Sequence, residues 1–138
     1  TAPFLLTRYC WPSMKKQKWG RIVNIASIHA LIASPYKVAY IAAKHGLVGL
    51  TRTAALEGGE FGITANAICP AYVRTPLVEA VLQRPGFLEA VRARTPMARV
   101  ADAREIAWPV MFLASAGASY ITGQTLFVDG GWMAECGI

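Results

Sequence analysis

The sequence predicts an α/β fold with a parallel sheet, and three observations support this. Residues 21–27, 63–70 and 124–131 have the apolar, β-branched composition of buried strands. Helical segments separate them, and strands that alternate with helices form βαβ units. The chain has 138 residues, of which 54% are hydrophobic, so one packed domain is expected and disorder is not.

The first helical segment covers residues 3–16, with an expected interruption near Trp11 and Pro12. The sequence starts with Thr1 and shows no cap before this helix, so we expect further residues upstream. The strand at residues 21–27 is apolar throughout. Because an exposed edge of this kind favours aggregation, we expect another strand beside its outer side.

A loop leads into the central helix, residues 38–57. This helix is expected to end loosely at Gly58 and Gly59, with Gly62 shortly after. The strand at 63–70 follows. The sequence shows no repeat, low-complexity run or second domain.

Residues 71–96 are rich in turns and short helices. Asp102 and Glu105 have the spacing of a capping box, which predicts the start of a helix that runs to about Ser115. Pro109 is unexpected inside this helix, because an interior proline costs about 3 kcal/mol. The third strand follows it.

The net charge is +6, and its densest cluster is the segment MKKQKWGR at residues 14–21. Such a cluster fits a nucleic-acid patch. It equally fits a solvated helix end, where cations complement the helix dipole, and we favour this second interpretation. We therefore expect no nucleic-acid partner.

The three cysteines, Cys10, Cys69 and Cys136, are an odd number without metal-ligand spacing. They indicate reduced thiols in a cytoplasmic protein and predict no metal site. No apolar run is long enough to span a bilayer, and no signal-peptide pattern opens the chain. No membrane partner is expected.

Tyr40 and Lys44 lie four residues apart and therefore share one face of the central helix. Since a neighbouring ammonium favours the phenolate, the pair can act as a proton shuttle. A snorkelling lysine beside a half-buried tyrosine is the alternative. Ser27 ends the first strand, where ligands bind in open parallel sheets, and its hydroxyl can polarise a carbonyl. It can also be a simple turn residue.

Four segments occur in one order: GRIVNIAS, Tyr40-x-x-x-Lys44, NAICPAYVRTP and ITGQTLFVDGGW. Together they resemble the short-chain dehydrogenase/reductase family over essentially the whole chain. The resemblance implies a three-layer Rossmann-type parallel sheet and a nicotinamide cofactor. Residues 1–138 would form a single partial domain, the C-terminal half of that fold.

The resemblance also implies roles for three side chains. Tyr40 would be the general acid/base that exchanges a proton with the substrate oxygen. Lys44 would assist it and bind the nicotinamide ribose. Ser27 would orient and polarise the carbonyl group.

The loop after the second strand would contact the nicotinamide end of the cofactor, together with Tyr40. Its contacts would come from Pro70, Ala71, the backbone of Val73 and the hydroxyl of Thr75. The family usually has glycine where this chain has Ala71, so a methyl group there would crowd the cofactor slightly.

Two segments, NIASIHALIASPYKVAYIAAKHGLVGLT and NAICPAYVRTPLVE, most resemble the bacterial 3-hydroxybutyrate dehydrogenases within the family. Those enzymes interconvert (R)-3-hydroxybutyrate and acetoacetate with NAD. His29 and Lys37 stand at the positions that would bind the substrate carboxylate. Without the resemblance, His29 fits a plain loop histidine and Lys37 a solvated surface charge. Residues 77–96 would form a substrate lid.

One position in this lid departs from the related enzymes. They have a glutamine where this chain has Val81, and Gln83 lies two residues further on. The substrate assignment therefore lacks one of its expected carboxylate contacts.

The glycine-rich dinucleotide turn of the family and its cofactor-selecting acidic residue are absent from these residues. The family's catalytic asparagine would lie two residues upstream of Thr1. We expect the isolated fragment to show no measurable dehydrogenase activity and to bind NAD weakly.

Two other interpretations stay open. The first is a related reductase for a 3-oxoacyl thioester or a sugar alcohol. The second is a catalytically inactive oligomerisation or interaction module. The family also implies a homo-oligomer, either a dimer or a tetramer.

Overall fold

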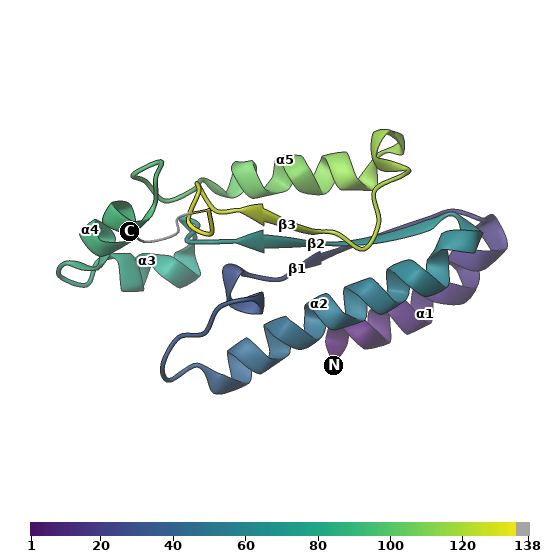
Figure 1. The fold of residues 1–138 in the computed structure, drawn as a ribbon, viewed down its shortest axis with the longest axis horizontal. Helices are drawn as coiled ribbons and strands as arrows, with labels where there is room; N and C mark the ends of the chain where they lie inside the picture. Colours follow the sequence, from purple (N-terminus) through teal and green to yellow (C-terminus); the bar gives the residue numbers. More distant parts are fainter. Residues whose placement is uncertain (135–138) are drawn as a thin grey trace.

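The computed structural model describes residues 1–134, and Figure 1 shows their arrangement. The expectation for Cys136 lies outside the described residues. The α-helices and strands are, in chain order, α1 (Ala2–Gln17), β1 (Gly20–Ile25), α2 (Val38–Gly58), β2 (Ile63–Pro70), α3 (Pro76–Leu82), α4 (Phe87–Arg94), α5 (Ala103–Ala114) and β3 (Thr125–Val128). Short 3₁₀ turns are η1 (Ile28–Ala30), η2 (Gly59–Phe61) and η3 (Ala116–Ala118).

The three strands form one parallel sheet in the order β1-β2-β3. Helices α1 and α2 cover one face and α5 covers the other, so the fold has three layers (Figure 1). Strand β2 lies in the centre and is buried along its length except at Pro70. This architecture confirms the predicted α/β class.

Small residues determine how closely α2 approaches the sheet. Ala54 and Ala55 of α2 pack against Ala65 of β2, and all three are buried. On the opposite face, Ile68 packs with Leu113 of α5. The two faces of β2 are therefore both core, which explains its almost unbroken apolar sequence.

Strand β1 pairs only with β2 among residues 1–134. Ile25, near its carboxyl end, is 45% exposed. The outer edge of β1 is thus open in the described part of the chain. The additional strand expected at this edge stays a prediction.

The expected interruption of the first helix is wrong, because α1 continues through Pro12. Because proline has no backbone amide hydrogen, Pro12 removes one hydrogen bond from the helix. Trp11 packs against the alanine cluster of α2 and β2, and Met14 contacts Gly20. These tertiary contacts hold the turn in place. The helix ends at Lys18, which adopts a left-handed conformation with φ of 51°.

The end of α2 is close-packed and not loose as expected. A Cβ atom at Gly58 would lie 2.9 Å from Cβ of Ile63. Glycine at this position therefore lets the end of α2 pack closely against the start of β2, which follows after η2.

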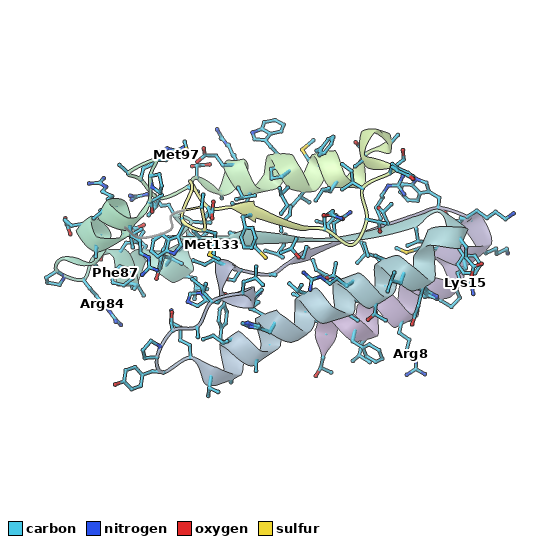
Figure 2. The ribbon with its side chains drawn as sticks, viewed as in Figure 1. Arg8, Lys15, Arg84, Phe87, Met97 and Met133 are labelled. Atoms are coloured by element: carbon cyan, nitrogen blue, oxygen red, sulfur yellow. The ribbon has the colours of Figure 1, made fainter. Side chains whose placement is uncertain are left out.

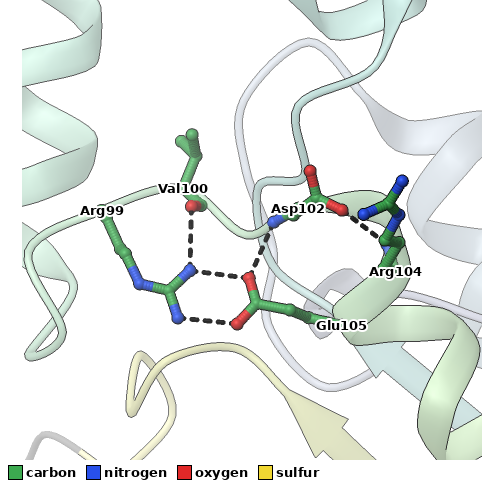
Figure 3. A network of polar contacts seen from close by, with 5 residues as sticks. All are labelled: Arg99, Val100, Asp102, Arg104 and Glu105. Carbon is green, nitrogen blue, oxygen red and sulfur yellow. Dashed lines mark hydrogen bonds and ion pairs between the residues drawn. The ribbon is translucent and has the colours of Figure 1, made fainter.

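Helix α5 starts as predicted. Asp102 accepts the amide of Arg104 at 2.9 Å, and Glu105 accepts the amide of Asp102 at 2.8 Å (Figure 3). Arg99 donates two further hydrogen bonds to Glu105, at 2.6 and 2.7 Å. These Arg99 bonds, with the Asp102 amide, lower the pKa of Glu105 to about 2. Pro109 lies inside the helix, as its sequence position indicated.

Candidate active site

A cleft of about 360 Å³ lies at the carboxyl ends of β1 and β2. The β1 side and α2 contribute Ser27, Ile28, His29, Lys37 and Tyr40, while the segment after β2 contributes Ala71, Tyr72 and Val78. Parallel strands bring their carboxyl ends to one edge, so residues distant in sequence meet there. The structure thus assembles five of the residues named from the sequence.

Ser27 follows β1 and lies at the inner wall of the cleft. Ala26, the residue before Ser27, still pairs with β2, because its amide donates to the carbonyl of Ile68 at 2.7 Å. Ser27 itself is 7% exposed, and its Oγ accepts the backbone amide of His29 at 3.2 Å. The hydroxyl therefore keeps its proton for a ligand or for the histidine ring.

Tyr40 and Lys44 lie one turn apart at the start of α2, as predicted. Lys44 Nζ donates to the carbonyl of Ile25 at 2.8 Å and lies 5.6 Å from the centroid of the Tyr40 ring. The lysine is thus held at the end of β1, and it does not extend into solvent as a snorkelling side chain would. An ammonium has three donors, so two remain for a ligand. Tyr40 is 45% exposed and reaches the cleft.

His29 is buried between two serine hydroxyls. Its Nε2 lies 2.7 Å from Oγ of Ser34, and its Nδ1 lies 3.4 Å from Oγ of Ser27. Burial lowers the pKa of His29, and the charge of Lys37 lowers it further. The ring packs edge-on to Tyr40 at a centroid distance of 5.8 Å. Lys37 is exposed at the rim and is the cation among the cleft residues.

The segment after β2 continues along the same edge. Ala71 lines the cleft, and its amide donates to Val128 of β3 at 3.3 Å. Val73 pairs with Ala101 in an isolated bridge. Thr75 occupies the N-cap of α3 without a side-chain capping bond, which leaves its hydroxyl free of the helix. Pro70, Val73 and Thr75 do not line the cleft itself.

These features fit the nicotinamide end of a dinucleotide. The spare donors of Lys44 suit ribose hydroxyls, and the uncommitted hydroxyl of Thr75 suits a carboxamide. Ala71 lines the cleft, and the slight crowding of the cofactor expected from its methyl group stays a prediction.

Tyr72, which lines the cleft, and Ser34, which contacts His29 from outside the lining residues, were not foreseen from the sequence. Tyr72 packs edge-on to Phe87 of α4 and lies 5.5 Å from the Trp132 ring. Burial raises the pKa of Tyr72, against the opposing charge of Arg94. Ser34 reaches His29 from a loop. Tyr72 could have been found from the sequence, because it directly follows Ala71. No sequence pattern links Ser34 to His29.

The predicted lid contains α3 and α4, and Figure 2 shows Phe87 of this lid at the end of the molecule opposite to Lys15. Of its residues, Val78 reaches the cleft, whereas Val81 and Gln83 do not. The basic cluster is thus remote from the cleft. There Lys15 lies over the Phe61 ring at 4.0 Å.

Within residues 1–134, no group of three or more His, Cys, Asp or Glu side chains is arranged to hold a metal ion. In the same range, no helix combines the length and apolar character needed to cross a membrane. Cys10 is exposed and Cys69 is buried, and both are free thiols.

A family model described as enoyl-(acyl carrier protein) reductase matches residues 1–133. The chain belongs to the short-chain dehydrogenase/reductase family. It is 43% identical to a D-beta-hydroxybutyrate dehydrogenase of Rhizobium meliloti, over 98% of this chain and 56% of that protein. It is 42% identical to an acetoacetyl-CoA reductase of the same organism, over 95% of this chain and 54% of that protein.

Among solved structures, a gluconate 5-dehydrogenase from Burkholderia cenocepacia in complex with NADP and tartrate superposes with a TM-score of 0.93. The identity is 32%, over 96% of this chain and 52% of that one. This short-chain dehydrogenase/reductase chain spans about half the length of the curated relatives it matches. The predicted family and its Rossmann-type sheet are confirmed.

Proposed function

We propose that this chain is the catalytic half of an NAD-dependent dehydrogenase that interconverts (R)-3-hydroxybutyrate and acetoacetate. The observation that carries the proposal is a single cleft containing Ser27, Tyr40 and Lys37. A proton donor, a hydroxyl and a cation in one cleft suit a substrate that has both a carbonyl and a carboxylate. The name of the Rhizobium meliloti relative supports the same substrate class.

In the reducing direction, the chain's own residues act on the substrate oxygen. Tyr40 donates its proton to the carbonyl oxygen as negative charge develops there. Ser27 donates a hydrogen bond to the same oxygen and fixes the carbonyl in the cleft. Lys37 binds the carboxylate through a charge-assisted hydrogen bond, and His29 lines the same wall.

The nicotinamide cofactor, when bound, supplies or accepts the hydride. Its binding site is proposed to include Tyr40, Lys44 and the residues Pro70, Ala71, Val73 and Thr75. NAD is the proposed form. NADP is the alternative, because the Burkholderia cenocepacia relative was solved in complex with NADP.

The test is acetoacetate reduction by the full-length natural protein that contains this chain, with NADH and NADPH compared. Tyr40→Phe removes the acidic hydroxyl and keeps the ring. We expect kcat to fall by about 10²- to 10⁴-fold, the usual worth of a general acid. Tyr36→Phe is the matched control, because Tyr36 is fully exposed and outside the cleft.

Near-normal turnover of Tyr40→Phe would refute the role of Tyr40. Circular dichroism and thermal unfolding of both variants check that the fold is intact. A loss in Tyr36→Phe as large as in Tyr40→Phe would show that the effect is not specific to the cleft.

A second candidate substrate class follows from the relatives named acetoacetyl-CoA reductase and gluconate 5-dehydrogenase. A reductase for a 3-oxoacyl thioester or a sugar alcohol would use Ser27 and Tyr40 in the same way. Values of kcat/KM for acetoacetate, acetoacetyl-CoA and 5-ketogluconate decide between them. An inactive interaction module would turn over none of the three.

We also propose that the protein is a homodimer or homotetramer located in the cytoplasm. Large apolar side chains on α1 and α5 are exposed, among them Leu6, Tyr9, Trp108 and Met111. Faces of this kind commonly bind a second copy. The free thiols of Cys10 and Cys69 agree with a reducing compartment.

A further inference from the structure

The loop between η1 and α2 places a serine hydroxyl behind the His29 ring. Ser34 Oγ lies 2.7 Å from Nε2 of His29. On the other side of the ring, Nδ1 lies 3.4 Å from Oγ of Ser27. One imidazole therefore connects Ser34 to the serine that lines the cleft.

The position of the His29 proton decides what Ser27 can do. Burial and Lys37 lower the pKa of His29, so the ring is neutral near pH 7 and has one donor and one acceptor nitrogen. With the proton on Nδ1, the ring donates toward Ser27 Oγ, which already accepts the His29 amide at 3.2 Å. The Ser27 proton then points to a ligand. With the proton on Nε2, Nδ1 would compete for the Ser27 proton.

The direction of the hydrogen bond between Ser34 and the ring corresponds to one tautomer or the other, because a hydroxyl can either donate to Nε2 or accept from it. A Ser34 hydroxyl that donates its proton to Nε2 across this distance of 2.7 Å leaves the ring proton on Nδ1. Pro35 restricts the backbone of Ser34 to extended conformations, which limits the positions that its side chain can reach. The ring is also confined, because His29 is 7% exposed and packs edge-on to Tyr40.

We propose that Ser34 is a positioning residue that holds His29 as the Nδ1–H tautomer and thereby directs the Ser27 hydroxyl toward the substrate carbonyl. The inference rests on the role of Ser27 in the proposed function. It assigns the His29 ring to Ser27 and leaves Lys37 as the carboxylate ligand.

The first test compares Ser34→Ala and Ser34→Thr in the full-length natural protein, with acetoacetate as substrate. Ser34→Ala should lower kcat by about five- to tenfold, as expected for one lost hydrogen bond, and change KM by less than about twofold. Ser34→Thr keeps the hydroxyl and should restore kcat. Ser119→Ala, an exposed serine far along the chain, is the matched control and should have no effect.

Three outcomes would overturn the inference. An unchanged kcat in Ser34→Ala shows that Ser27 does not depend on Ser34. A lower KM at constant kcat shows that freed Nε2 binds the carboxylate directly. Failure of Ser34→Thr to restore kcat shows a structural role in the loop.

The second test needs no turnover. Imidazole ¹⁵N NMR spectra of the wild-type protein, with His29 assigned through His29→Gln, should show the proton on Nδ1. A proton on Nε2 overturns the inference whatever the activity, and it does so even if Ser34→Ala fails to fold. Absence of turnover with every carbonyl substrate, together with an Nδ1 proton, would refute the proposed function and leave the tautomer assignment intact.

Discussion

Lys37 provides the sharpest test of the proposed substrate class, through the variant Lys37→Met. Lys37 lines the same cleft as Ser27 and Tyr40, and its charge is close enough to lower the pKa of His29. A charge-assisted hydrogen bond contributes about 1.5–3 kcal/mol. Because Lys37 is exposed, solvent screens it, and we expect about 1–2 kcal/mol of binding energy. This corresponds to a rise of about five- to thirtyfold in KM for acetoacetate.

Steady-state kinetics on the full-length protein measures this change. Acetoacetate is compared with its uncharged methyl ester, for which KM should stay constant because no carboxylate is present. Lys16→Met is the matched control, since Lys16 lies in the last turn of α1 beside Lys15, which Figure 2 shows at the end of the molecule opposite to Phe87. The reasoning is refuted if KM for both substrates rises equally, or if KM for acetoacetate does not change.

The remaining predictions concern stability. Tyr36 is fully exposed with φ of +62°, so Tyr36→Gly loses no packing. It relieves about 1–2 kcal/mol of left-handed strain against about 0.5–1 kcal/mol of added chain entropy, and urea unfolding should show a gain of about 0.5–1 kcal/mol. A loss would mean that Tyr36 makes an unrecognised contact. The lowered pKa of His29 makes the unfolded state bind its proton more readily, so stability should fall as pH drops below about 6.5. Thermal unfolding from about pH 7 to pH 5 should show a shallower fall in His29→Gln, and an unchanged slope would contradict this.

The alternation of strands and helices was predictable because it follows from local composition. The capping box at Asp102 and Glu105 was equally visible, since both partners lie within one turn. Pro12 was misjudged because a rule about isolated helices ignores tertiary contacts. Trp11 packs on the alanine cluster and keeps the helix continuous.

The site was only partly predictable, for a related reason. The positions of Ser27 at a strand end and of Tyr40 and Lys44 on one helix face are local features, and their roles are what the family resemblance implies. Tyr72 and Ser34 act through partners on other segments, namely Phe87 and His29. No spacing rule connects such pairs, because loops set their distance.

The sequence by itself determined the fold class, because periodicity is a property of neighbouring residues. Its ordered motifs also indicated the family, and the resemblance implied which residues to propose for the chemistry. The tertiary structure decided that Lys44 turns inward to Ile25 and that His29 is enclosed by two serines. These contacts of Lys44 and His29 depend on how β1, α2 and the loop between them pack together. The packing sets the burial and the hydrogen-bond partners of the two side chains, and these decide which donors remain free for a substrate.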